Sequence, residues 1–405
     1  MSCFCPCPTL LRRLSFHAGM LACAIFGMLA AGASGAQTLD PGFTPTFNGA
    51  VQAVALQPDG RILVGGDFSS VNGSPRFALA RLLDNGSLDL DFVPPLFDDG
   101  VSAIVVQPDG RILVAGDFIT ANGAAAKHVV RLLANGSVDS SFASGIDHWT
   151  ALGISHLALQ ANGRILVAGG FDSVSGQARP GLAKLLPSGT LDSGFAPPAL
   201  DNRIAALALQ PSGAVVIAGY HGDDLDSCAD FGYCVTRLTA SGADDTGFGA
   251  AQVIGEVSHI ASDGHGGFVL GGSFGGVGGQ FVSCVARLLQ DGGADPMFVD
   301  TTLRYSDIDH VVPRADGRIL IGGGIRWGTA GTTTTRVARL SASGVHDTTF
   351  IEPVFDSQIN VMVPDSANRL LVGGLFTHVD GVSRQRLARI VLDDLPDPIF
   401  GNGFE

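Results

Sequence analysis

Residues 57–68 have the sequence QPDGRILVGGDF, and a nearly identical sequence recurs as QPDGRILVAGDF at residues 107–118 and as QANGRILVAGGF at residues 160–171. Weaker copies of this stretch end at Tyr220, Phe274, Ile325 and Phe376. Chance does not reproduce a stretch of this length at even intervals, so the chain is built from internal repeats.

A shorter marker, D-x-x-F, sets the period of the repeat. It begins at Asp40, Asp89, Asp139, Asp192, Asp245, Asp295, Asp347 and Asp397, at intervals of 49 to 53 residues. Eight markers enclose seven units with a mean length of 51 residues. We therefore expect seven copies of one small structural module.

The residues inside a unit have the pattern of β-strands. VQAVALQ (51–57) and RILVGG (61–66) are short, β-rich runs, and the Pro58-Asp59-Gly60 turn separates them. A third run, FALARLL (77–83), is followed by a hairpin that returns through GSLDLDF (86–92). The pattern predicts three or four strands in each unit and no helix.

The hairpin loop sets a register in which residue i faces residue i+8. Six of its seven copies end in glycine, as a three-residue loop with its last residue in the left-handed region requires. This register places a cation opposite a carboxylate in every unit: Arg81 and Asp89, Arg131 and Asp139, Lys184 and Asp192, Arg237 and Asp245, Arg287 and Asp295, Arg339 and Asp347, Arg389 and Asp397. We interpret these as structural ion pairs, each worth about 0.2 to 1 kcal/mol if exposed.

Both faces of the first two strands are apolar, which indicates small sheets packed face to face. Units of this length with about four strands are typical of a β-propeller, so we predict an all-β, seven-bladed β-propeller. The eighth marker is a surplus copy: either Asp40–Phe43 or Asp397–Phe400 completes a blade begun at the other terminus. The alternative is an open solenoid, which would need polar caps at both ends.

QPDGRILVGGDF, ARLLDNGSLDLDF and their copies resemble the bacterial delta-60 repeat, a β-propeller family of exported proteins. The resemblance covers about Asp40 to Phe400 and implies the propeller fold without any catalytic residues. It weakens in the fourth to seventh units, where Gly60 is replaced by Asn368 and the Arg61 position holds Ala214 and Gly267.

Composition and charge exclude several protein classes. The 405 residues are 46% hydrophobic and 15% charged, which excludes a disordered chain. A formal charge of −14 makes nucleic acid an unfavourable partner. The domain prediction is an export signal at 1–36, the propeller at 37–400 and a short tail at 401–405.

The first 36 residues have the features of an export signal. Arg12 and Arg13 precede an apolar run from Ala18 to Ala33, and small residues lie before Gln37, where cleavage is expected. The alternative is a lipoprotein that carries its lipid on Cys23. No later stretch is long and unbroken enough to span a bilayer. The tail GNGFE resembles C-terminal tails of exported Gram-negative proteins, so we expect a periplasmic, cell-surface or extracellular location.

Three cysteines remain after the predicted leader, namely Cys228, Cys234 and Cys284. Cys228 and Cys234 bracket an Asp-rich insertion, so a disulfide between them is one interpretation in an oxidising compartment. Three buried free thiols are the alternative.

Three histidines, His156, His259 and His310, take the position that Ala53 holds in the first unit. This strand is expected to be innermost, so the imidazoles could reach the channel and hold a ligand there. The alternative is that they pack separately between blades. No cofactor is predicted, except for calcium as a weak candidate at the acidic loops Asp98-Asp99-Gly100 and Asp223, Asp224 and Asp226.

Three functions are compatible with the sequence. The favoured one is a monomeric, non-catalytic scaffold that binds an unknown protein or cell-surface ligand through its variable loops. The second is a lyase or hydrolase acting at the channel mouth with the three histidines. The third is a structural component of the cell surface.

Overall fold

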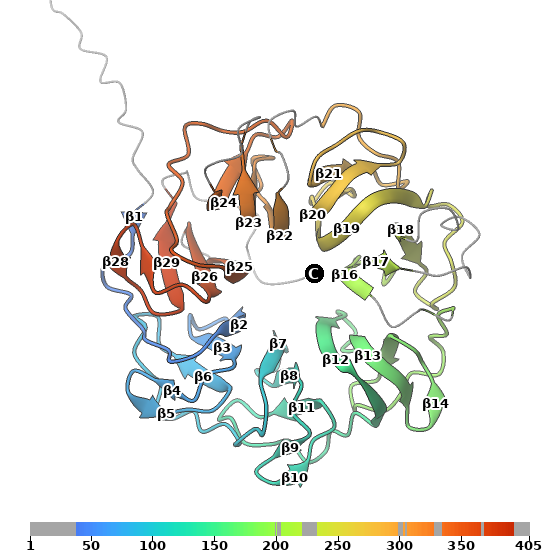
Figure 1. Ribbon diagram of the computed structural model, residues 1–405. Helices are drawn as coiled ribbons and strands as arrows, with labels where there is room; N and C mark the ends of the chain where they lie inside the picture. Colours follow the sequence, from blue (N-terminus) through green and yellow to red (C-terminus); the bar gives the residue numbers. More distant parts are fainter. Residues whose placement is uncertain are drawn as a thin grey trace, which may run out of the picture. The chain divides into compact units, whose positions relative to one another are not determined.

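The described part of the chain consists of β-strands and the turns that join them (Figure 1). The structure is a computed structural model, and it describes residues 38–198, 200, 204–220, 233–298, 303, 306–327, 334–365 and 368–392, without the side chains of 147–152 and 220. Within these ranges there is no helix, and hence none that is long and apolar enough to cross a membrane.

The first unit shows the plan that the later units follow. Strands β2 (Val51–Leu56), β3 (Ile62–Gly66) and β6 (Leu79–Leu82) form an antiparallel sheet in that order. Gly60 has a φ of 83° in the turn between β2 and β3, a conformation that glycine adopts without steric cost. A small hairpin, β4 (Ser70–Val71) and β5 (Ser74–Pro75), stands between β3 and β6 in the chain.

The later units keep this plan with changes in strand length. The second unit contains β7 (Val101–Val106), β8 (Ile112–Gly116), β9 (Thr120–Ala121), β10 (Ala124–Ala125) and β11 (Val129–Leu132), and the third contains β12 (Ile146–Leu159), β13 (Ile165–Val174), β14 (Gln177–Ala178) and β15 (Leu182–Leu185). The fourth unit contains β16 (Ile204–Leu209), β17 (Val215–Tyr220) and β18 (Tyr233–Leu238), and the fifth contains β19 (Ala251–Ser262), β20 (Phe268–Val277) and β21 (Val285–Leu288). The sixth unit contains β22 (Asp307–Pro313), β23 (Ile319–Arg326) and β24 (Thr334–Leu340), and the seventh contains β25 (Ile359–Asp365), β26 (Arg369–Gly374), β27 (His378–Val379), β28 (Val382–Ser383) and β29 (Leu387–Val391). The fourth and fifth units share one sheet, because β18 pairs with β19.

The sheets follow one another around a common centre, and the first strand of each sheet lies nearest to it (Figure 1). These first strands contact each other in chain order from β2 to β25, and β25 contacts β2. The apolar core lies between neighbouring sheets. Leu63 of β3 packs in one cluster with Val114 of β8, and Val51 of β2 packs in another with Leu371 of β26.

The hairpin cation of the first unit, Arg81, contacts three groups. Its Nε lies 2.8 Å from Oδ2 of Asp89, and its guanidinium carbon lies 4.5 Å from the ring centroid of Phe92. Its Nη1 donates a hydrogen bond to the carbonyl of Ala134 in the hairpin of the next unit, at 2.6 Å. The cation therefore joins both residues of its own D-x-x-F marker to the neighbouring unit.

The same arrangement recurs around the chain. The ion pairs are Arg131–Asp139 (2.8 Å), Arg237–Asp245 (2.7 Å), Arg287–Asp295 (2.6 Å) and Arg339–Asp347 (2.8 Å). The bonds to the next hairpin run to the carbonyls of Pro187, Ala240, Gln290 and Ala342 from Arg131, Lys184, Arg237 and Arg287. These contacts are largely buried, with the Arg81 side chain 9% exposed, so the value expected for exposed pairs does not describe them.

One of the predicted pairs needs correction, and one is not tested. In the third unit the Lys184 ammonium donates to the carbonyl of Ala240 at 2.8 Å, and Asp192 is bound by Arg164 Nε at 2.8 Å. A lysine presents its donors at one point, whereas the arginine fork serves a carboxylate and a carbonyl together. In the seventh unit the predicted partner of Arg389, Asp397, lies outside the described residues.

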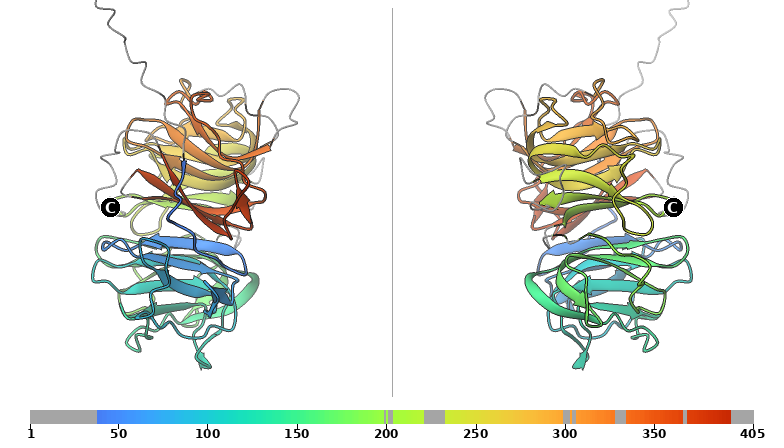
Figure 2. Two further views of the ribbon diagram at one scale, coloured as in Figure 1. Left: turned by 90° about the vertical axis from the view of Figure 1, so that its left-hand side faces the viewer. Right: turned by 90° about the vertical axis from the view of Figure 1, so that its right-hand side faces the viewer.

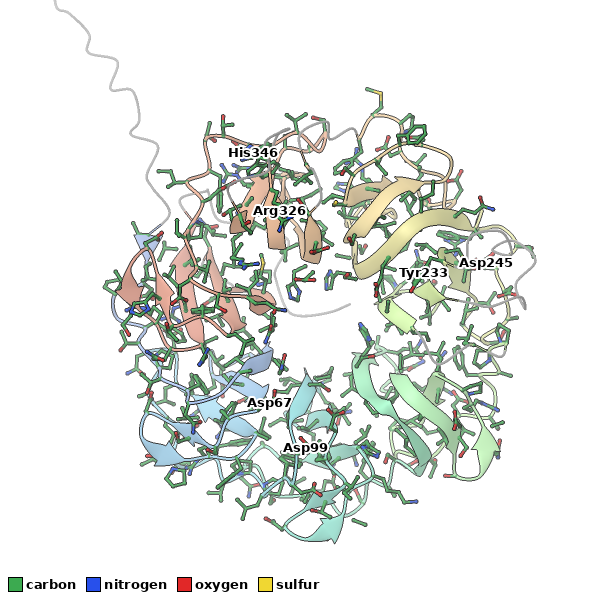
Figure 3. The ribbon with its side chains drawn as sticks, in the orientation of Figure 1. Asp67, Asp99, Tyr233, Asp245, Arg326 and His346 are labelled. Atoms are coloured by element: carbon green, nitrogen blue, oxygen red, sulfur yellow. The ribbon has the colours of Figure 1, made fainter. Side chains whose placement is uncertain are left out.

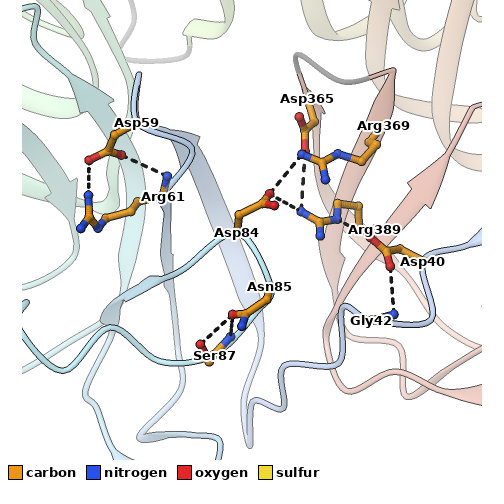
Figure 4. A network of polar contacts seen from close by, with 10 residues as sticks. All are labelled: Asp40, Gly42, Asp59, Arg61, Asp84, Asn85, Ser87, Asp365, Arg369 and Arg389. Atoms are coloured by element: carbon orange, nitrogen blue, oxygen red, sulfur yellow. Dashed lines mark hydrogen bonds and ion pairs between the residues drawn. The ribbon is translucent and has the colours of Figure 1, made fainter.

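Arg389 binds the marker at the beginning of the chain. Strand β1 (Thr38–Leu39) pairs with β29, and this N-terminal segment runs beside the last sheet in all views (Figures 1 and 2). Arg389 Nε lies 2.9 Å from Asp40, and its guanidinium lies 4.4 Å from the Phe43 ring. Its Nη1 is 2.8 Å from Oδ1 of Asp84 in the first hairpin (Figure 4). The N-terminal marker therefore completes the last sheet.

Replacing Phe43 by alanine is expected to lower the free energy of unfolding by about 3 to 5 kcal/mol, because this ring is fully buried under Arg389. Urea-induced unfolding measures the change. Phe77→Ala is the control, because Phe77 is 44% exposed and its loss is expected to change stability by about 0.5 kcal/mol or less.

Phe400→Ala tests the marker at the other terminus in the same assay. A loss of stability from this substitution equal to or larger than the loss from Phe43→Ala would contradict completion of the last sheet by the N-terminal marker.

Candidate functional site

The three histidines lie at one level of the innermost strands. His156 of β12 is opposite Ala168, His259 of β19 is opposite Gly271, and His310 of β22 is opposite Gly322. In each strand a register shift immediately precedes the histidine, as it precedes Ala53 in β2. This register shift is therefore a feature of the repeat, and the imidazole side chain is what distinguishes these three units from the first.

The structure brings two of the three rings together. The ring centroids of His259 and His310 are 5.6 Å apart, with an edge-to-face angle of 62°. The backbone N–H of Val311 donates to Nδ1 of His259 at 3.3 Å, which places the proton of the neutral ring on Nε2. His156 contacts the hydroxyl of its neighbour Ser155 at 2.8 Å.

The protein around these rings lowers their basicity. Burial lowers the pKa of His156 and of His310 to about 4. Burial, together with the positive charge that His310 and His156 would carry, lowers the pKa of His259 to about 3. All three imidazoles are therefore neutral at pH 7, and they offer one donor and one acceptor each rather than positive charge.

Metal binding finds no support in the described residues, where no group of three or more His, Cys, Asp and Glu side chains could hold a metal ion. Asp98, a calcium candidate from the sequence, accepts hydrogen bonds from the backbone N–H groups of Ile119 and Thr120 at 3.0 and 2.8 Å. It therefore caps the start of β9. Asp223, Asp224 and Asp226 lie outside the described residues.

The cysteines divide into two kinds. Cys234 is disulfide-bonded, and its predicted partner Cys228 lies outside the described residues. Cys284 is a buried free thiol whose Sγ lies 3.0 Å from the carbonyl oxygen of Ser306.

A second site, which the sequence analysis did not single out, is a pocket of about 740 Å³ between the fourth and fifth units. Its ion pair Arg237–Asp245 belongs to the fourth hairpin, and Asp245 lies far from the centre of the molecule (Figure 3). The charged or titratable side chains that line it are Arg237, Asp263, His265, Arg287, Asp291 and Asp295.

The pocket occurs where the repeat has lost an arginine. In the first and third units, Arg61 and Arg164 place Nε 3.1 and 2.8 Å from the hairpin aspartates Asp89 and Asp192. The fourth and fifth units hold Ala214 and Gly267 instead, so no second guanidinium covers the hairpin ion pair. The missing arginines can be seen in the sequence as departures from the repeat, but the pocket that results depends on how the hairpins pack.

The equivalent place between the second and third units gives a direct comparison. It holds a smaller cavity of about 420 Å³, lined by Arg111 and Arg131 among others. The exposed fraction of the hairpin arginine changes in the same sense, from 5% for Arg131 to 14% for its equivalent Arg237, and Arg287 of the fifth unit is 24% exposed. Loss of the covering arginine therefore both enlarges the pocket and exposes its floor.

Trp327, His346 and Glu352 form another cluster that the sequence analysis missed. The rings of Trp327 and His346 are stacked at 3.7 Å, and Glu352 Oε1 accepts hydrogen bonds from Trp327 Nε1 at 2.9 Å and from His346 Nε2 at 3.0 Å. The indole and one imidazole nitrogen thus share one carboxylate oxygen within the cluster, which indicates a local structural role.

The fold and the repeat have known counterparts. The family model "Domain of unknown function (DUF5122) beta-propeller" matches residues 57–92, 107–142, 160–195, 314–350 and 368–400. The chain is a β-propeller repeat protein. The matched segments omit residues 196–313, which include most of the fourth and fifth units of the propeller and the pocket between them.

Two solved structures are similar to this propeller. Virginiamycin B lyase from Staphylococcus aureus has 11% sequence identity and a TM-score of 0.57, and the match covers 88% of this chain and 99% of the lyase. An extracellular domain of a hybrid two-component system from B. thetaiotaomicron has 9% identity and a TM-score of 0.48, with 86% of this chain and 42% of that chain covered. At this identity the likeness to the lyase shows the fold alone. No curated protein matches the chain.

His156, His259 and His310 are expected to make the stability of the protein sensitive to acid. Their pKa values in the folded state, about 4 and about 3, lie below the 6.5 of a free imidazole, so the unfolded chain binds protons first. Their contribution to stability is complete above pH 6.5 and is lost as the pH falls towards 4, by up to about 1.4 kcal/mol per pH unit for each group.

Urea unfolding of the wild type and of a variant with His156, His259 and His310 replaced by glutamine measures this loss. The variant is expected to show a shallower decline between about pH 7 and pH 4. Asp309 acts in the opposite direction, because burial and Asp307 raise its pKa to about 6, but it is present in both proteins. Identical pH profiles of the two proteins would contradict the prediction.

Proposed function

We propose that this protein is an exported, non-catalytic, seven-bladed β-propeller that binds a partner at the pocket between its fourth and fifth units. Closure of the ring is supported by three contacts between the last and first units. Strand β25 lies against β2, Asn360 Nδ2 donates to the carbonyl of Val51 at 3.1 Å, and Arg389 binds Asp84. The disulfide at Cys234 supports export, because such bonds persist in oxidising compartments.

One observation carries the binding function: a cavity of about 740 Å³, larger than the cavity of about 420 Å³ at the equivalent place, lies where two consecutive copies have both lost the same arginine. Residues kept in every unit, such as the hairpin cations, serve the ring itself. Ala214 and Gly267 are departures that open a concave, charged surface without removing a hairpin ion pair. Concave sites with converging polar groups are the usual form of ligand sites.

An enzyme acting in the channel is the second candidate, and the contact between the His259 and His310 rings favours it. The pKa values of these histidines, about 3 and about 4, argue against it. A general base is most effective when its pKa lies near the working pH. An imidazole with a pKa this low is a weak proton acceptor and contributes little to proton transfer in the transition state. Neutral rings are better suited to hydrogen bonding than to proton transfer.

Gly247 allows the pocket to be filled without changing a charged group. A Cβ at this position would meet only Asp245 Oδ1, at 3.2 Å, and equivalent positions carry Ser141 and Met297. The Gly247→Trp variant should therefore fold. Gly194→Trp is the matched control, since Gly194 is the same position of the third unit and has the same surroundings.

The test is capture of partners from culture medium and cell envelope by the chain produced with its own leader. We expect the wild type and Gly194→Trp to retain the same partner and Gly247→Trp to lose at least nine-tenths of it, a tenfold change or about 1.4 kcal/mol. Equal capture by all three would contradict the pocket. Loss of capture or of an activity with His259→Ala, and not with Gly247→Trp, would instead favour the channel.

A further inference from the structure

The seventh unit shows which group the pocket lacks. Asp263 of the fifth unit and Asp365 of the seventh unit hold the same repeat position, four residues before Gly267 and Arg369. Asp365 Oδ2 lies 2.8 Å from Nη2 of Arg369 and 3.8 Å from Nη1 of Arg389 (Figure 4). The fifth unit has kept the aspartate and lost the arginine that binds it.

The pocket has also gained negative charge relative to its equivalents. Asp263 and Asp291 replace Gln160 and Ser188 of the third unit, where Arg164 is present. From the third unit to the fifth, one positive charge is therefore removed and two negative charges are added at the same place.

The bonds recorded for these two carboxylates come from backbone N–H groups. Asp263 accepts from His265 N and Gly267 N, each at 2.8 Å, and Asp291 accepts from Gly293 N at 3.0 Å. Such bonds shape the turns but add only partial positive charge. Each carboxylate has further acceptor capacity for a cation that enters the pocket.

The two arginines of the pocket are engaged elsewhere. Arg237 Nε lies 2.7 Å from Asp245, and its Nη1 donates to the carbonyl of Gln290 at 2.9 Å. Arg287 places Nε 2.7 Å from Asp295. Each of these charges is neutralised within its own hairpin, so the charges of Asp263 and Asp291 remain.

We propose that this pocket binds the guanidinium group of an arginine side chain presented by a partner polypeptide. This inference rests on the proposed function, since it names the chemistry that the partner brings to the same pocket. A planar guanidinium can donate to two carboxylates at once, which a compact ammonium does less well. The half-exposed Leu289 in the wall offers an apolar surface to the methylene stem of the arginine. The formal charge of −14 attracts such a cation from a distance.

The experiment uses the peptide Gly-Gly-Arg-Gly-Gly and its counterpart in which citrulline replaces arginine, with affinities measured by isothermal titration calorimetry. Citrulline keeps the shape of arginine and lacks its charge. We expect the arginine peptide to bind at least tenfold more tightly, and its affinity to fall as sodium chloride is added. Equal affinities would overturn the proposal. Agmatine is a third probe, and tighter binding of agmatine than of the peptide would overturn the assignment to a partner polypeptide.

Two variants test whether the arginine peptide binds in this pocket. The double substitution Asp263→Asn and Asp291→Asn keeps an acceptor oxygen for each turn and removes both charges, so we expect at least a tenfold loss of affinity for the arginine peptide. His265→Arg removes no acid and adds a tethered guanidinium that competes with the peptide, so the same loss is expected. Asp109→Asn, an exposed carboxylate at the smaller cavity, is the matched control. Unchanged affinity in both pocket variants would overturn the proposal.

The two proposals fail in different ways. If Gly247→Trp abolishes partner capture while the arginine and citrulline peptides bind alike, the pocket is a binding site of another chemistry and only this inference fails. If Gly247→Trp captures the partner as well as the wild type does, the proposed function fails.

Discussion

A buried guanidinium that serves two neighbouring units at once is the interaction on which this propeller depends. Arg81 pairs with Asp89 in its own hairpin, covers the Phe92 ring and donates to Ala134 of the next hairpin. The desolvation cost of burying the charge is offset only while all these partners are present. The D-x-x-F marker therefore recurs for a physical reason: its aspartate neutralises the cation, and its phenylalanine supplies the apolar floor under it.

In a linear series of such links, the marker at Asp40 has no hairpin cation before it and the first hairpin has no preceding unit. Arg389 supplies the contact that each of these two groups lacks. It binds Asp40 and Phe43 from the beginning of the chain, and its Nη1 binds Asp84 of the first hairpin. The contact between the last and first units is therefore the same interaction made once more between distant parts of the chain.

The local part of this interaction can be predicted from the sequence, and the rest cannot. A three-residue loop sets the register that faces Arg81 with Asp89, so spacing alone predicts the pair. The bond to Ala134 spans 53 residues and depends on how sheets pack, which spacing does not contain. The two terminal markers are alike, so the sequence left open which of them completes the last sheet. Alignment put three histidines at one level, but the rings of His259 and His310 meet because their units are neighbours.

The identity of the hairpin cation in a unit decides whether the second arginine, at the Arg61 position, is needed there. In the third unit the ammonium of Lys184 is committed to the next hairpin, so Arg164 must neutralise Asp192 and could not be lost. In the fourth and fifth units the hairpin cation is itself an arginine and fulfils both tasks, which makes the second arginine dispensable there. At Gly267 a Cβ would lie 2.5 Å from the carbonyl oxygen of Leu288, so no side chain fits at this position without a shift of its surroundings. The hairpin ion pairs of the fourth and fifth units are therefore retained beside the pocket although the second arginine is absent there.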